Sequence, residues 1–72
     1  MDKTVDARGL SCPQPVLLTL DVLRTIESGE ILILVDTDTS KENVIRAAAS
    51  KGWRAKKVQP DGIDYHIMIA KD

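Results

Sequence analysis

The chain has 72 residues, of which 43% are hydrophobic and 29% are charged, and it has no low-complexity tract; this composition predicts one small globular domain (residues 1–72) with little core to spare. The formal net charge of −1 lacks the basic excess that marks a chain as a nucleic-acid binder, so no direct DNA binding is expected. A single cysteine excludes an internal disulfide, and together with the single histidine it is too little for a zinc cluster.

Nothing in the sequence predicts export or membrane insertion. Residues 1–15 hold acidic residues, a glycine and prolines before any apolar stretch, unlike a secretory signal peptide. The longest nearly apolar run, at 31–35, is far too short to cross a bilayer. We therefore expect a cytoplasmic location, where a lone thiol stays reduced.

The first half of the chain predicts a strand, a helix and a second strand. Residues 3–6 are a short candidate strand followed by a loop. From Pro13 to about Ser28, apolar residues recur at three- and four-residue spacing, and Gly29 stands where a C-terminal cap glycine belongs. The segment 30–36, with its apolar run at 31–35, predicts a central strand. The helical stripe comprises Val16, Leu20 (or Thr19), Leu23 and Ile26.

The second half predicts a second helix and two more strands. Residues 39–42 have the spacing of a capping box in which Thr39 caps a helix over about 40–51 that ends at Gly52. A tight turn at 60–62 separates two strand-like segments. These segments are residues 53–59 and residues 63–70, the latter with Tyr65, Ile67 and Ile69 on one side.

The resulting order is β-α-β-α-β-β. Because crossover connections are right-handed, both helices fall on the same face of a four-stranded mixed sheet. The sequence therefore predicts an α/β (α+β) two-layer sandwich. The other face of the sheet stays partly open, and part of the apolar 31–35 run contributes to it.

The lone thiol, Cys12, stands at the entry of the first predicted helix. Pro13 falls at the first helical position, where a missing N–H costs nothing, and Pro15 lies two residues later. The Gln14 amide stays close to the position of the sulfur. The positive end of the helix dipole would favour a thiolate there and lower the pKa of the cysteine, and Arg8 could add to this field.

The surroundings of Cys12 restrict its chemistry. Pro15 occupies the place of the resolving cysteine of a C-x-x-C oxidoreductase, and His66 lies far along the chain in the last predicted strand, so no base is nearby. A sulfur nucleophile without either partner is suited to accepting a sulfur atom as a persulfide, holding it and passing it on. The alternative is a small buried apolar cysteine, the usual fate of free cysteines.

At this motif the sequence resembles the TusA/SirA/YedF family of small sulfur carriers. The segments that carry the resemblance are "VDARGLSCPQPVL", "GEILILVD" and "ENVIRAAASKGW". The resemblance implies a two-layer α/β sandwich and a cytoplasmic persulfide carrier without a cofactor. It makes Cys12 the sulfur-bearing group, with Pro13 and Pro15 as the helix-entry frame and Gly9 as the turn.

The resemblance also implies partners: a donor, either a cysteine desulfurase or a rhodanese, and a downstream acceptor protein. Members of the tRNA-thiolation branch usually show Asp-Asp-Pro and Asp-Ile-Pro stretches where this chain reads "DTDT" and "ENVIR". The segment "ENVIRAAASKGW" of this chain is closer to the YedF-like branch, some of whose members are linked to selenium metabolism. Other branches accompany thiosulfate-uptake transporters. The pathway therefore stays open among tRNA thiolation, cofactor maturation, sulfur oxidation, thiosulfate uptake and selenium metabolism.

Leu17 and Leu18 lie away from the main helical stripe, just behind the cysteine. They form either an apolar docking rim for a partner enzyme or part of a wide core-facing stripe.

A loose basic group around the second helix could steer an acidic partner or RNA, but a solvated face is the simpler interpretation, and Trp53 alone gives little support for RNA. His66 has no second metal ligand, and Asp36 and Asp38 are interpreted as turn and cap residues. The basic group comprises Arg46, Lys51, Arg54, Lys56 and Lys57.

Three functions remain in competition on these residues. In the first, Cys12 carries a persulfide between proteins as a sulfurtransferase-type carrier, not as a multiple-turnover enzyme. In the second, the fold is an adaptor of a transporter, an enzyme or an RNA, and the cysteine is incidental. In the third, a small enzyme releases sulfur or selenium from a donor such as thiosulfate with the help of an external reductant.

Overall fold

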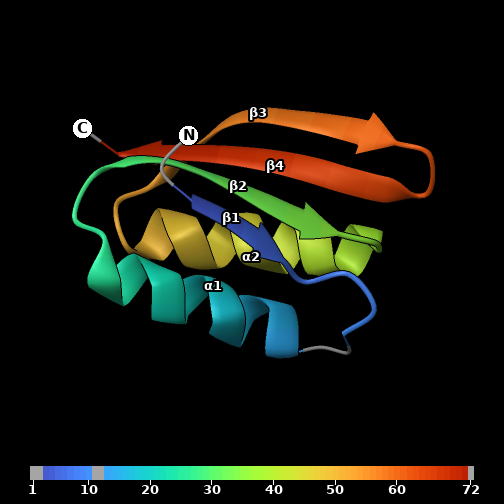
Figure 1. The fold of residues 1–72 in the computed structure, drawn as a ribbon, viewed down its shortest axis with the longest axis horizontal. Helices are drawn as coiled ribbons and strands as arrows, with labels where there is room; N and C mark the ends of the chain where they lie inside the picture. Colours follow the sequence, from blue (N-terminus) through green and yellow to red (C-terminus); the bar gives the residue numbers. More distant parts are fainter. Residues whose placement is uncertain (1–2, 11–12, 72) are drawn as a thin grey trace.

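The computed structural model describes residues 3–10 and 13–71. Within them the elements follow the predicted order β-α-β-α-β-β and form two layers, a sheet and a pair of helices (Figure 1). Neither helix is long and apolar enough to span a membrane. The elements are β1 (Lys3–Asp6), α1 (Gln14–Thr25), β2 (Gly29–Val35), α2 (Asp38–Ser50), β3 (Arg54–Asp61) and β4 (Asp64–Lys71).

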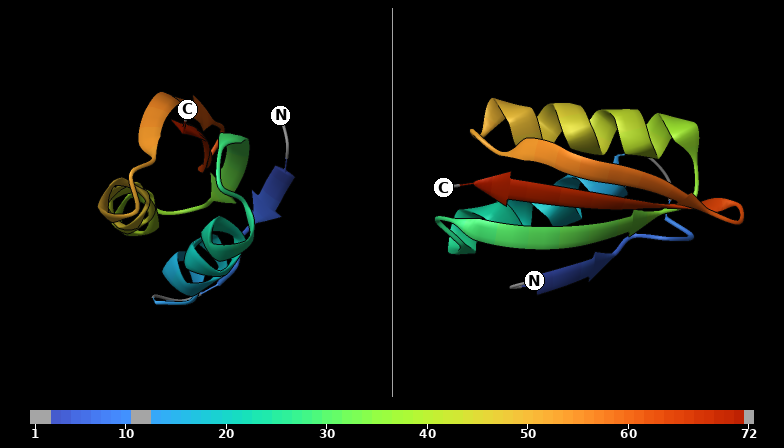
Figure 2. Two further views of the ribbon diagram at one scale, coloured as in Figure 1. Left: turned by 90° about the vertical axis from the view of Figure 1, so that its left-hand side faces the viewer. Right: turned by 90° about the horizontal axis from the view of Figure 1, so that it is seen from above.

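The four strands form one mixed sheet in the order β1-β2-β4-β3. β1 runs parallel to β2, with Val5 opposite Ile33, and α1 provides the crossover between them. β4 runs antiparallel to both β2 and β3, so the latter two are parallel and α2 connects them across β4. Figure 2 shows both helices on the same side of the curved sheet. The predicted two-layer sandwich is confirmed.

Helix α1 is shorter than its sequence pattern predicted. It ends at Thr25, and Ile26 is already extended (φ −122°, ψ 119°), so Gly29 starts β2 and is not a helix cap. Pro13 is the N-cap and not the first helical residue, because its carbonyl accepts the first helical bond, from the Leu17 N–H at 3.1 Å. The buried side chains of α1 are Pro15, Thr19 and Leu23.

Helix α2 starts at Asp38, and its N-cap, Thr37, lies two residues before the predicted cap. Thr37, in extended conformation, accepts a hydrogen bond on its side-chain oxygen from the Ser40 N–H at 3.0 Å. This bond satisfies one N–H of the first turn, which has no intrahelical acceptor. Thr39 lies inside the helix and is exposed, so the prediction of a capping box at 39–42 is wrong. After the helix, Gly52 adopts the left-handed conformation (φ +84°).

β3 and β4 form a hairpin whose turn is shifted from the predicted position. Pro60 and Asp61 still belong to β3, and the two turn residues are Gly62 and Ile63. Gly62 has φ +65° whereas Ile63 does not have a positive φ, the pattern of a type II′ turn with glycine in its first central position. The pairing shifts by one residue between Ala55 and Lys57.

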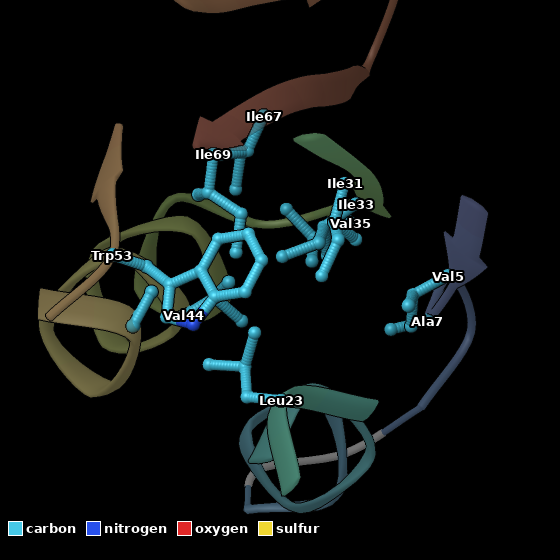
Figure 3. Packing of buried hydrophobic residues seen from close by; sticks show 11 residues of the cluster. Val5, Ala7, Leu23, Ile31, Ile33, Val35, Val44, Trp53, Ile67 and Ile69 are labelled. Atoms are coloured by element: carbon cyan, nitrogen blue, oxygen red, sulfur yellow. The ribbon is translucent and has the colours of Figure 1, made fainter. Parts of the chain in front are cut away.

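The core lies between the sheet and the two helices (Figure 3). Alternate residues of β2 and β4 point into it, and Ile31 and Ile33 of β2 lie opposite Ile69 and Ile67 of β4. Trp53, which follows α2, is only 3% exposed and belongs to the core. The helices contribute Leu23, Val44 and Ala48.

Candidate functional site

The loop after β1 is fixed to the end of the neighbouring strand. The Ala7 N–H donates to the Leu34 carbonyl at 2.9 Å, and the Gly9 N–H donates to Asp36 Oδ2 at 2.8 Å. Gly9 has φ +78°, a left-handed conformation that glycine adopts without steric cost. Cys12 follows three positions after Gly9 in the chain. Ser11 and Cys12 lie outside the described residues, so the placement of Cys12 stays a prediction.

The entry of α1, immediately after Cys12 in the chain, presents backbone donors. Pro13 and Pro15 have no N–H, which leaves those of Gln14 and Val16 as the first donors of the helix. Among residues 3–10 and 13–71 no side chain caps them, and the first turn holds no acidic residue. This entry differs from that of α2, where Thr37 supplies the cap. A negatively charged group beside Gln14 would therefore meet these N–H groups and the positive end of the helix dipole.

An apolar surface adjoins this entry on one side. Leu17 and Leu18 are 54% and 38% exposed, which excludes the interpretation that they belong to a wide core-facing stripe. An open groove of about 270 Å³ runs along this face of α1. The residues that line it are Leu10, Gln14, Leu17, Leu18 and Asp21.

A second groove lies on the other side of the same entry, between the two helices. Pro13 and Val16 of the α1 side face Asn43, Arg46, Ala47 and Ser50 of α2 across a volume of about 350 Å³. Three of its six lining residues are polar, namely Asn43, Arg46 and Ser50, and the other three are apolar. The two residues that follow Cys12 in the chain, Pro13 and Gln14, thus each line one groove.

Arg8 is engaged by carboxylates. Its Nε and Nη2 donate to the two oxygens of Asp6, both at 2.9 Å, and its Nη1 reaches Asp64 Oδ2 at 3.5 Å. The hydrogen bonds from Arg8 lower the pKa of Asp6 to about 2, and this pairing raises the pKa of Arg8. A guanidinium shared by two carboxylates projects a weaker field, so Arg8 contributes less to a thiolate than an isolated cation would. Its predicted influence on Cys12 stays a prediction.

Asp36 has a positioning role that the sequence interpretation missed. Turn and cap roles were predicted for Asp36 and Asp38. Asp36 instead holds the loop before Cys12 through Gly9, whereas Asp38 opens α2 and has its pKa lowered by a hydrogen bond from the Tyr65 hydroxyl. The parallel pairing of Asp6 with Leu34 brings residues 9 and 36 together. That pairing is the signal that would have pointed to this contact.

Comparisons with known proteins agree with this arrangement. The sequence model of the family described as "Sulfurtransferase TusA" matches residues 3–71. The chain belongs to the TusA family. It is 39% identical over 60 residues to the "Putative sulfur carrier protein YrkI" of Bacillus subtilis (strain 168), an alignment covering 83% of this chain and 80% of that protein.

Two further similarities bear on fold and length. The crystal structure of a SirA-like protein from Desulfitobacterium hafniense superposes with a TM-score of 0.84 at 28% identity and covers 94% of this chain and 95% of that one. A "Putative sulfur carrier protein" of Aquifex aeolicus (strain VF5) is 43% identical over 44 residues. That alignment spans 61% of this chain but only 22% of the Aquifex protein. The family resemblance seen in the sequence is confirmed.

The remaining polar residues of the described part of this TusA-family chain do not gather into a metal site. His66 Nε2 lies 3.1 Å from Asp61 Oδ2, and no group of three metal-ligating side chains occurs among residues 3–10 and 13–71. The predicted basic group is divided: Arg46 lines the groove between the helices, whereas Arg54 and Lys57 lie on the face of the sheet away from the helices. It does not form one patch for RNA or an acidic partner.

Proposed function

We propose that this chain is a cytoplasmic sulfur carrier that holds a persulfide on Cys12 and passes sulfur from a donor protein to an acceptor protein. Membership of the TusA family supports the carrier function. The observation that supports the assignment to Cys12 is the entry of α1, where two prolines lack N–H groups and no side chain of the described residues caps the helix, so that the Gln14 and Val16 N–H groups can face an anionic sulfur.

The transfer step requires no cofactor and no net oxidation. The Cys12 thiolate attacks the outer sulfur of a persulfide on the donor, the S–S bond of the donor breaks, and the donor cysteine leaves as a thiolate. The new S–S bond lies on Cys12. An acceptor thiolate reverses the roles and takes the outer sulfur in the same way. Because this chain has no second cysteine to attack the persulfide, the sulfur stays until an acceptor arrives.

Each exchange brings a donor or acceptor cysteine against Cys12, so the partner must rest on the surface around it. The groove with the exposed Leu17 and Leu18 supplies apolar area for that contact. We propose that the donor is a cysteine desulfurase or a rhodanese and that it docks here. Asp21 at the edge of the groove, paired with Arg24, gives the contact a polar rim.

The experiment is the intact mass of the protein after incubation with a cysteine desulfurase and cysteine, beside Cys12→Ser. We expect a gain of one sulfur atom that a reductant removes and that the variant lacks. A gain only with thiosulfate and a rhodanese would identify the donor system as one of sulfane-sulfur metabolism or thiosulfate uptake. Absence of any adduct from both sources would contradict the carrier function.

Docking is tested by replacing Leu17 with serine and measuring the initial rate of sulfur loading. The matched control is Ile63→Ser, because Ile63 is an exposed apolar residue (85%) in the β3–β4 turn and lines neither groove. We expect slower loading, by about fivefold or more, in the first variant only. Equal rates in the two variants would contradict a docking role for Leu17.

A further inference from the structure

The face of the sheet opposite the helices has an apolar centre without a covering element among the described residues. Leu32 and Leu34 of β2 point away from the core, and Met68 of β4 lies directly opposite Leu32. All three are partly exposed, while their neighbours Ile31, Ile33 and Ile67 on the other face are fully buried. Figure 1 shows the helices on the far side of the sheet from this face.

Ion pairs frame this apolar centre at both ends. At one end Arg8 reaches from the loop after β1 across the end of β2 to Asp64 on β4. At the other end Lys56 of β3 reaches across β4 to Glu30 on β2. An apolar centre within a polar rim is the usual anatomy of a protein–protein interface.

The two ends carry opposite charge among the described residues. The end near the β3–β4 turn holds three carboxylates and one guanidinium, and the opposite half holds three cations and one carboxylate. The first group consists of Asp6, Asp61, Asp64 and Arg8, with His66 beside Asp61. The second consists of Arg54, Lys56, Lys57 and Glu30.

We propose that this face binds the same face of a second copy of the chain, with the strands of the two sheets running in opposite directions. A two-fold axis that crosses the strands in the interface plane reverses their direction and keeps each strand over its own copy. The acidic half of one sheet then lies over the basic half of the other, twice. An isologous interface must be complementary to itself, and this arrangement of charges has that property.

The registers identify the contacts. In β4, Asp64 and Ala70 lie at equal distances on either side of Ile67, and their β3 partners are Asp61 and Arg54. A two-fold axis near Ile67 therefore places Arg54 of one copy over Asp61 of the other. The same axis places Leu32 of one copy over Leu34 of the other and Met68 over His66, with the sheets about 10 Å apart.

The size of the face sets the expected strength. Four strands about 4.8 Å apart and about six residues long offer about 400 Å² on each partner. This area is at the low end for specific interfaces, so we expect a reversible dimer with a dissociation constant on the order of 10–100 µM. The helices, and with them both grooves at the entry of α1, would face outward on each copy. The dimer does not depend on sulfur chemistry.

The experiment is sedimentation equilibrium of the full chain from about 5 µM to 1 mM in excess reductant, so that no Cys12 disulfide contributes. We expect a concentration-dependent dimer in the wild type and a loss of at least tenfold in affinity in Leu34→Glu. Leu17→Glu, which changes an exposed leucine on the helix side, is the matched control and should not alter association. Circular dichroism establishes that each variant is folded.

Charge exchange tests the direction of the strands. Arg54→Glu and Asp61→Lys should each weaken self-association, because each places like charges opposite one another. An equimolar mixture of the two variants should form a heterodimer, since the two introduced side chains, of opposite charge, then face each other while the unchanged Arg54 faces the unchanged Asp61. A wild type that stays monomeric at every concentration would overturn the proposal. A dimer lost in Leu17→Glu and kept in Leu34→Glu, or a mixture no tighter than its components, would also overturn it.

Discussion

Replacing Gly9 by alanine perturbs the backbone of the loop before Cys12. A Cβ added at Gly9 meets no atom of the described residues within 4 Å, so we expect the cost to arise from the backbone. At φ +78° an L-residue is less stable than glycine by about 1–2 kcal/mol, and the lower entropy of the unfolded chain offsets up to about 1 kcal/mol. We expect a net loss of about 1 kcal/mol in the free energy of unfolding, or about 4–8 °C in Tm.

Urea unfolding of three variants tests whether the positive φ of Gly9 causes the loss of stability. Gly9→Asn should lose less than Gly9→Ala, since asparagine tolerates positive φ. Gly62→Ala is the matched control, because Gly62 also has a positive φ (+65°) and open space around an added Cβ, but it lies in the β3–β4 turn. Both alanine variants should lose similar stability, and only Gly9→Ala should slow sulfur loading of Cys12. Equal stability of Gly9→Ala and the wild type, or equal loss of loading in both alanine variants, would refute the reasoning.

Three further predictions concern the scaffold. Thr37→Ala should lower the free energy of unfolding by about 1 kcal/mol in urea titrations because it removes the N-cap of α2, whereas Thr39→Ala should be nearly neutral; the reverse order would contradict the observed cap. Asp6 has a pKa of about 2, below its unfolded value, so its pairing with Arg8 stabilises the fold above about pH 4 and is lost as the pH falls toward 2. The stability difference between wild type and Asp6→Asn should therefore shrink between pH 7 and pH 2.5, and a constant difference would contradict it. Ile33→Ala should cost about 2–5 kcal/mol by thermal or urea unfolding, because Ile33 is fully buried between β2 and the helices; a cost below about 1 kcal/mol would contradict its central place in the core.

Local patterns in the sequence were enough to predict the element order and the inward-facing residues. The three- and four-residue spacing in α1 and the alternation in β4 depend on helical and strand geometry alone. Leu23 of the predicted helical stripe is buried, and Ile67 and Ile69, predicted to share one side of their strand, both face the core. The Cys-Pro-x-Pro motif, together with two further segments, likewise indicated the TusA family, whereas the role of Cys12 stays a prediction. The exact ends of the helices were harder to predict, because the stretch 37–40 offers both Thr37 and Thr39 as caps. In the structure β2 ends at Val35, and Thr37, not Thr39, is the N-cap of α2.

Contacts between distant segments were decided only by the tertiary structure. The bond from Gly9 to Asp36 depends on the parallel register of β1 and β2, and the exposure of Leu17 and Leu18 depends on which side of α1 packs against the sheet. The opposite charges at the two ends of the open face arise from the order β1-β2-β4-β3 and from the shift between Ala55 and Lys57. A periodic pattern determines which side of an element is apolar. Which residues of two elements meet is determined by the packing of the whole chain, because strand register is set by burial across the sheet.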